Sequence, residues 1–159
     1  MIDADTFRSV LGRFASGVTI LTARDASGTD HGMTASAFCS LSLDPSLVLF
    51  CVDRTASMHD FLVTHPMVGV SVLSADQEVH SRRFAADEDD RFDGIAFTRG
   101  ESGVVLLEAA LAHMECRVIR HHDGGDHTIF IAEVDHATTR AAEGRPLLYY
   151  RGGYAQLAR

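Results

Sequence analysis

Apolar residues recur at two different spacings along the chain, and these spacings separate the expected helices from the expected strands. Within residues 3–15 the apolar positions are three or four apart, which places them on one face of a helix. We expect Asp3 or Asp5 to cap this helix and Gly17 to end it. The apolar face consists of Phe7, Val10, Leu11 and Phe14.

Most of the remaining chain has the pattern of strands. Residues 47–52 are almost continuously apolar, which predicts a strand buried on both faces. Residues 31–38 predict an unusual strand of small and hydroxylated residues. Gly124 and Gly125 lie in a predicted hairpin turn between two long strands. The other expected strands are 18–23, 67–73, 112–120, 127–138, 147–150 and 154–157, with 106–111 a short strand or a turn of helix.

Two further helices are expected between strands. One covers residues 55–65, with Thr55 or Ser57 as its cap. The other covers residues 75–86 and is followed by an acidic loop at 87–94. Its inward-facing residues are predicted to be Val79 and Phe84.

These elements favour a mainly β protein built on an antiparallel barrel. About seven β segments are joined by short connections, and the long crossover helices of a parallel sheet are missing. The length of 159 residues fits one domain over residues 1–159.

Composition narrows the possible chemistry. The net charge is −8, and all 14 basic side chains are arginine. Without lysine the chain has no Schiff-base or P-loop chemistry, and the acidic balance argues against nucleic-acid binding. The chain has no apolar run long enough to cross a membrane, and we expect a cytoplasmic protein with reduced thiols at Cys39, Cys51 and Cys116.

Three segments are candidates for a binding site, and each has an ordinary structural alternative. Small residues in 32–40 suit close approach to a planar ring, or merely tight sheet packing. Residues 53–57 suit phosphate binding at a helix start, or an ordinary helix cap. His127, after a glycine turn, suits contact with a hydride donor, or a solvent-facing position. A zinc site from Cys116, His121, His122 and His127 matches no known ligand spacing, so we expect no metal.

Taken in order, the sequence resembles the flavin reductase family, the reductase component of two-component flavin-dependent monooxygenases. The resemblance covers essentially the whole chain. It rests on the ordered segments 14–19, 32–38, 42–52, 84–85, 91–94, 125–127 and 148–154, together with Ser57.

The resemblance implies a fold, an activity and partners. The fold would be a six-to-seven-stranded antiparallel Greek-key split β-barrel with a few short flanking helices. The activity would be hydride transfer from NADH or NADPH to FMN or FAD, with the reduced flavin passed to a partner monooxygenase. The protein would be a homodimer.

The resemblance also implies site residues. His127 would lie near the nicotinamide. Arg83, or Arg54, would supply charge to the flavin phosphate. The flavin and pyridine nucleotide would contact Met33, Thr34, Ala35, Ser36, Ala37, Cys51, Val52, Asp53, Ser57, Ser81, Arg83, Phe84, Tyr150, Arg151, Gly152 and Tyr154.

Two rival functions stay open on this fold. One is a pyridoxamine-phosphate oxidase-like or deazaflavin-dependent enzyme, although such sites favour many Lys and Arg residues. The other is a non-catalytic flavin- or haem-binding protein.

Overall fold

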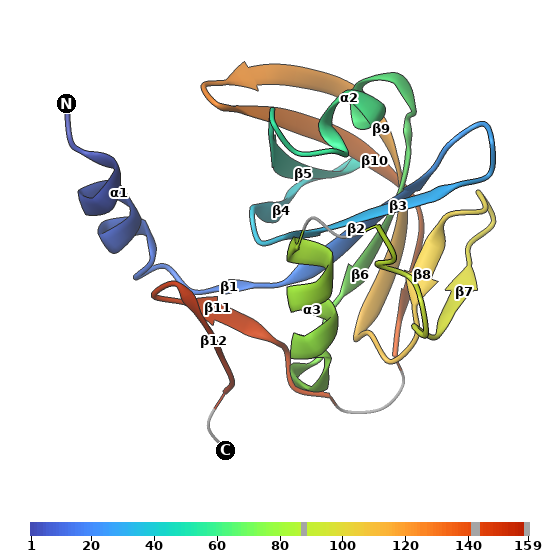
Figure 1. Cartoon of the computed structure of the whole chain (residues 1–159). Coiled ribbons are helices and arrows are strands. Elements are labelled where there is room, and N and C mark those ends of the chain that lie inside the picture. Colours follow the sequence, from blue (N-terminus) through green and yellow to red (C-terminus); the bar gives the residue numbers. More distant parts are fainter. Residues whose placement is uncertain (87–88, 141–143, 158–159) are drawn as a thin grey trace.

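A seven-stranded antiparallel sheet forms the centre of the computed structural model, which describes residues 1–86, 89–140 and 144–157 (Figure 1). Its edge strands, β3 and β4, are separated in the chain only by Ser36 and Ala37, so the sheet curls until its edges approach each other. This curled sheet confirms the predicted split barrel. In spatial order the strands are β3 (Asp30–Ala35), β2 (Thr19–Arg24), β6 (Met67–Val72), β9 (Ala112–Gly124), β10 (His127–Thr139), β5 (Ser46–Asp53) and β4 (Phe38–Leu43).

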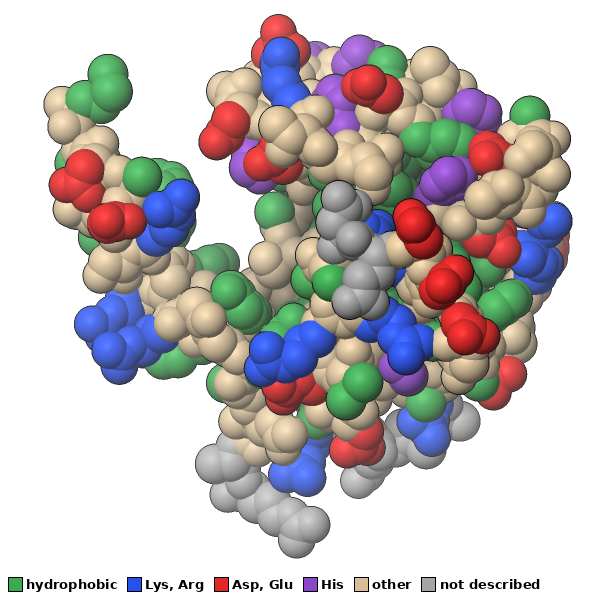
Figure 2. All heavy atoms as spheres, in the orientation of Figure 1, with side chains coloured by type: hydrophobic (Ala, Val, Ile, Leu, Met, Phe, Trp, Pro, Cys, Tyr) green, Lys and Arg blue, Asp and Glu red, His purple; other side chains and the backbone are tan. Residues whose placement is uncertain are grey.

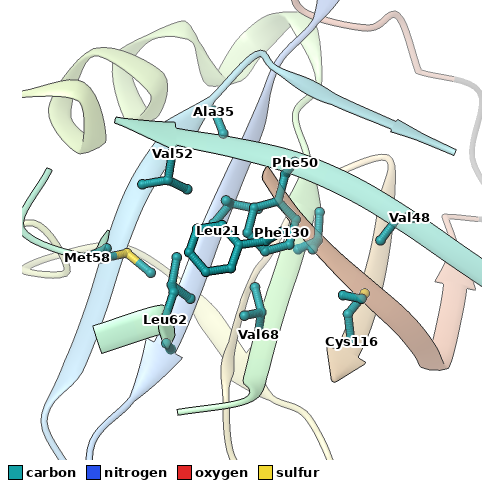
Figure 3. Packing of buried hydrophobic residues seen from close by; sticks show 13 residues of the cluster. Leu21, Ala35, Val48, Phe50, Val52, Met58, Leu62, Val68, Cys116 and Phe130 are labelled. Carbon is teal, nitrogen blue, oxygen red and sulfur yellow. The ribbon is translucent and has the colours of Figure 1, made fainter. Parts of the chain in front are cut away.

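The main core lies inside the curl of this sheet. Phe50 on β5 stacks on Phe130 on β10, with 5.4 Å between ring centroids, and Leu21 and Leu62 pack into the same cluster (Figure 3). All four side chains are almost completely buried. Each such burial stabilises the fold by about 1.5–3 kcal/mol relative to exposure.

Burial alternates along β5, which corrects one prediction. Val48, Phe50 and Val52 are buried, whereas the alternate residues are only half-buried. The unbroken apolar run at 47–52 therefore does not mark a strand buried on both faces in the single chain. The half-buried outer residues, with their neighbours across β10, are Leu47, Leu49, Cys51, Ile129 and Ile131.

Small sheets flank the barrel. A hairpin of β7 and β8 packs beside β2 and β6, and a three-stranded sheet of β1, β11 and β12 lies next to the N-terminal segment (Figure 1). Arg151 N donates to Gly12 O at 2.8 Å and fixes the β11–β12 turn against the chain after the first helix. The bounds are β1 (Ser16–Gly17), β7 (Phe97–Arg99), β8 (Val105–Leu107), β11 (Leu148–Tyr150) and β12 (Gly153–Ala155).

The first helix, α1 (Ala4–Leu11), projects away from the barrel (Figures 1 and 2). Asp3 caps it as predicted, since its carboxylate accepts from Thr6 N at 2.8 Å. The helix ends at Leu11 rather than near Gly17, because Ser16 and Gly17 pair with β11. No residue of α1 is buried.

The two later helices begin after their predicted starts. Helix α2 (His59–Thr64) has Met58 as its N-cap, so neither Thr55 nor Ser57 caps it. The segment 75–86 divides into a 3-10 turn (Ala75–Gln77) and α3 (Glu78–Ala85). On α3, Phe84 is buried as predicted but Val79 is 69% exposed. Five residues on a helix turn through about 500°, so these two side chains point to different faces.

Two strand boundaries also differ from the predictions. The single strand expected at 31–38 is broken at Ser36 and Ala37, where the chain passes from β3 to β4. The long hairpin of β9 and β10 is confirmed, with β9 continuing to Gly124 and Gly125 in the turn at φ 79°. Among the helices of the described residues, none has the length and apolarity needed to span a membrane.

Candidate functional site

A pocket of about 330 Å³ lies between β3, the segment after β5, and α3; we name it the central pocket. It brings together four of the residues predicted from the sequence, namely Met33, Thr34, Ser57 and Phe84. Its other lining residues are Thr55, Ala56, Ala85 and Arg91. The side chains around most of its wall are small, which leaves the backbone accessible to a flat ligand.

Hydrogen bonds fix the wall of the central pocket to α3 and to the C-terminal hairpin. Thr34 Oγ1 donates to Ser81 O at 2.6 Å. The buried Ser81 hydroxyl shares a 2.7 Å hydrogen bond with Tyr154 Oη. Thr34, Ser81 and Tyr154, three predicted residues far apart in the chain, therefore form one connected network.

Gly32 allows β3 to lie close to the aromatic floor of the site. A Cβ built at this position would lie 2.5 Å from Phe84 Cε1 and 3.0 Å from Phe92 Cζ. The two rings meet edge to face with 5.0 Å between centroids. Any side chain at Gly32 would push these two rings away from β3 and so change the shape of the pocket.

Arg91 is the arginine that reaches this site. Its Nη1 donates to Gly32 O at 2.6 Å, and the residue lines the central pocket. The two arginines nominated from the sequence make other contacts: Arg54 pairs with Asp123 at 2.6 Å, and Arg83 Nη1 donates to Asp93 O at 2.5 Å. Sequence reasoning missed Arg91 because it belongs to an acidic segment that looked like a solvated loop.

A second pocket, of about 310 Å³, adjoins the central pocket and shares Ser57 and Arg91 with it. We name it the distal pocket. Its other lining residues are Thr29, Asp30, His31, Gly32, Met58, Asp89 and Phe92.

A third pocket, of about 410 Å³, shares Ala85 with the central pocket and contains the predicted residues Gly152 and Tyr154. We name it the C-terminal pocket. The guanidinium carbon of Arg82 lies 4.7 Å from the centroid of the Tyr154 ring. Its remaining lining residues are Ala86, Tyr149 and Gly153.

His127 lies at the start of β10, directly opposite Asp53 on β5. Its Nδ1 is 2.7 Å from Asp126 Oδ1. Asp53 Oδ1 accepts from Thr55 N at 2.7 Å, and this bond is the main cause that lowers the pKa of Asp53, with a smaller effect from His127. Asp53 thus ends the strand that leads into the central pocket, and His127 begins the strand that pairs with it.

The remaining predicted residues line none of these three pockets. Ala35 and Val52 are buried in the core, whereas Ser36 and Ala37 are exposed at the β3–β4 connection. The other three are Cys51, half-buried beside that connection, and Tyr150 and Arg151 on the exposed β11–β12 turn.

Two of the three thiols lie in environments that favour the protonated form. Burial raises the pKa of Cys116 to about 12, so this thiol stays protonated. Burial also raises the pKa of Cys51. Within the described ranges no three His, Cys, Asp or Glu residues are placed to hold a metal ion. The central pocket itself offers small side chains, hydrogen-bonding groups and the charge of Arg91.

Comparison with known proteins identifies relatives that match this chain over almost its whole length. A family model described as a flavin reductase like domain matches residues 11–158. The chain is 39% identical over 158 residues to a flavin reductase (NADH) from Kitasatospora aureofaciens, covering 98% of this chain and 83% of that protein. It is 39% identical over 153 residues to the reductase subunit HsaB of a flavin-dependent monooxygenase from Rhodococcus jostii (strain RHA1), covering 96% and 77%.

A solved structure has the same fold. The NADH:FAD oxidoreductase SgcE6 from Streptomyces globisporus C-1027, in complex with NAD and FAD fragments, superposes with a TM-score of 0.92 at 41% identity. The match covers 99% of this chain and 96% of that chain.

Proposed function

The chain belongs to the flavin reductase like family, and on this premise we propose that it is an oxidoreductase that uses NADH to reduce FMN or FAD. The reduced flavin then serves a partner monooxygenase, as the name of the related reductase subunit suggests. Family membership favours this function over the pyridoxamine-phosphate oxidase-like, deazaflavin-dependent and haem-binding alternatives.

The central pocket is the observation that carries the proposal. Its small side chains suit a flat ring, and Arg91 and Ser57 at one end suit a phosphate. A flavin bound there supplies the ring position that accepts hydride from the nicotinamide. The chain has no lysine, so arginine must provide the cationic contact to the phosphate.

The residues of this chain would mainly bind and orient the two nucleotides. Thr34 is held toward α3 by Ser81, which keeps one wall of the central pocket fixed. His127, opposite Asp53, is assigned to the nicotinamide end. Orientation of two bound rings supplies most of the rate gain in such a reaction, and no strong acid or base is required.

The C-terminal pocket supports NADH rather than NADPH as the hydride donor. Arg82, which lines it, is paired with Glu78 through bonds of 2.9 and 2.7 Å to the same carboxylate oxygen. We assign the adenosine end of the hydride donor to this pocket, where the 2′-phosphate of NADPH would lie near the Glu78 carboxylate. The relative from Kitasatospora is also named for NADH.

We also propose that the protein is a homodimer. The apolar face of α1 is uncovered: Phe7, Val10 and Leu11 are 53%, 60% and 50% exposed, and Phe14, just beyond the helix, is 81% exposed. The outer residues of β5 and β10 form a second partly covered apolar surface. Two such surfaces on one chain suit burial against a second copy.

Steady-state NADH oxidation by the purified full chain tests the proposed function. We expect the rate to rise with added FMN or FAD, because the flavin acts as an exchangeable substrate, and to be much lower with NADPH. A rate that does not respond to either flavin would contradict the proposal.

The same assay tests the assignment of His127. His127→Ala should raise the KM for NADH about tenfold, the cost of losing one polar contact worth about 1.4 kcal/mol. His122→Ala, an exposed histidine on the neighbouring strand, is the control. Equal KM values for the His127 variant and the native chain would remove His127 from the nicotinamide site.

A further inference from the structure

The distal pocket adjoins the central pocket at Arg91, and we propose that it binds the AMP half of FAD, so that this protein prefers FAD to FMN. The inference rests on the proposed function, because it takes the flavin ring to lie in the central pocket.

The two pockets adjoin along β3 and have Ser57 and Arg91 in common. Met33 and Thr34 line the central pocket, while Asp30, His31 and Gly32 line the distal pocket. At about 3.3 Å per residue, the strand from Thr34 back to Asp30 extends about 13 Å. This length suits a nucleotide attached to the phosphate end of a flavin, whereas FMN would leave the distal pocket without a ligand.

The positive charge of Arg91 lies at the junction of the two pockets, where the FMN and AMP halves of FAD would be joined. Arg91 lines both pockets, and its bond to Gly32 O at 2.6 Å holds the guanidinium at their junction. Ser57, with its hydroxyl, is the other residue common to both. A forked guanidinium binds phosphate oxygens well, and the pyrophosphate of FAD is the group that lies between the FMN and AMP halves.

The walls of the distal pocket suit an uncharged adenosine. His31 is oriented by Asp25, with 3.0 Å between Nε2 and Oδ2, and its ring lies 4.8 Å from the Phe61 ring. A fixed imidazole gives adenine a flat surface on which to stack. The carboxylate of Asp30, paired with Arg99 at 2.7 Å, can accept hydrogen bonds from ribose hydroxyls.

The acidic residues of the distal pocket also argue against a further anionic group. Asp30 is neutralised by Arg99, but Asp89 is exposed and carries its charge at the rim. A nucleoside past the pyrophosphate avoids this charge, whereas a longer phosphate chain would not.

Isothermal titration calorimetry on the full chain with oxidised FMN and FAD tests the preference without relying on turnover. We expect FAD to bind about tenfold more tightly than FMN, which corresponds to about 1.4 kcal/mol. Added AMP should weaken FAD binding much more than FMN binding, because it fills the distal pocket, which FMN leaves empty. FMN binding as tight as FAD binding, or an AMP effect equal for both flavins, would overturn the inference.

A pair of histidine variants tests the residues involved. His31→Ala should lower the ratio of FMN to FAD dissociation constants to about one. His65→Ala is the matched control. The His65 ring stacks on the same Phe61 ring that His31 contacts, with 4.0 Å between the centroids of His65 and Phe61, but His65 lines neither pocket. An unchanged ratio in a folded His31 variant contradicts the proposal, and AMP competition decides the question if that variant does not fold.

The outcomes separate this inference from the proposed function. A chain that binds neither flavin and oxidises no NADH would contradict both the proposed function and the assignment of the distal pocket. A chain that reduces FMN and FAD, but binds them equally, keeps the proposed function and loses the assignment of the distal pocket.

Discussion

A single arginine distinguishes the site in the structure from the site expected on sequence grounds. Arg91→Gln should raise the dissociation constant of FMN at least tenfold, since a hydrogen bond to a charged group contributes about 1.5–3 kcal/mol. Riboflavin, which has no phosphate, should bind the variant and the native chain equally. Binding of both ligands is measured by calorimetry.

The arginines nominated from the sequence are the controls for this variant. Arg54→Gln and Arg83→Gln remove cations that are bonded to Asp123 and to Asp93 O. Both should leave FMN binding nearly unchanged. Loss of FMN affinity in the Arg83 variant alone would restore the sequence-based assignment and exclude Arg91.

At the scale of single residues, residue type alone predicted some members of the candidate site and not others. Thr34 and Ser57 could be proposed because hydroxyls in a strand of small residues and at a strand end suggest a polar ligand. Arg91 could not, because an arginine among acidic neighbours has the pattern of a solvated loop. Its bond to Gly32 O, which joins two distant segments of the chain, is part of what holds it at the pocket. Val79 is exposed although its spacing predicts an inward position, because apolar periodicity does not fix where a helix starts.

At the scale of elements, a buried carboxylate fastens the β7–β8 hairpin to the barrel. Glu115 on β9 is 4% exposed and accepts from Glu101 N at 2.9 Å and from Ser102 N at 2.8 Å. Burial alone would raise the pKa of Glu115, but the bonds from the side chain and backbone of Ser102 and the backbone of Glu101 outweigh it and lower the pKa below 4.5. Because the pKa of Glu115 is lower in the folded chain than in the unfolded chain, its carboxylate stabilises the fold at pH values above the pKa of the unfolded chain.

Glu115→Gln should therefore lower the free energy of unfolding by roughly 1–3 kcal/mol near neutral pH. The stabilisation by Glu115 is lost as the pH falls through its folded-state pKa, so the difference between variant and native chain should shrink in acid. Urea unfolding at pH values from about 7 to about 3 measures this. A difference that stays constant over this range would show that the variant acts through packing rather than through charge.

The fold itself was the most predictable property at this scale. Alternating strands, short connections and a glycine turn before His127 specify antiparallel neighbours, and the β9–β10 hairpin follows directly. The break at Ser36 and Ala37 was not predictable, because small residues suit both a strand and a connection. The contacts of Tyr154 with Ser81 join segments far apart in the chain, which no local pattern encodes.

At the scale of the whole molecule, the apolar run in β5 and the projecting α1 have one common explanation. Residues 47–52 have the composition of a strand covered on both faces, yet the described chain covers only one face well. Helix α1 is amphipathic and stands away from its own barrel (Figure 2), which leaves its apolar residues exposed. In the proposed homodimer a second copy would cover both surfaces, which gives the apolar outer residues of β5 and the apolar face of α1 the same role.

Replacing apolar residues of the α1 segment with charges tests this dimer. The double substitution Leu11→Asp and Phe14→Asp should convert the dimer to a monomer, because burying an unpaired carboxylate in an apolar interface costs several kcal/mol. Sedimentation velocity over a range of protein concentrations gives the molecular mass. Val63→Asp, which charges an apolar residue 42% exposed on α2, is the control and should stay dimeric. A native chain that sediments as a monomer at all concentrations, or a dimer that survives the double substitution, would show that the apolar face of α1 serves another purpose.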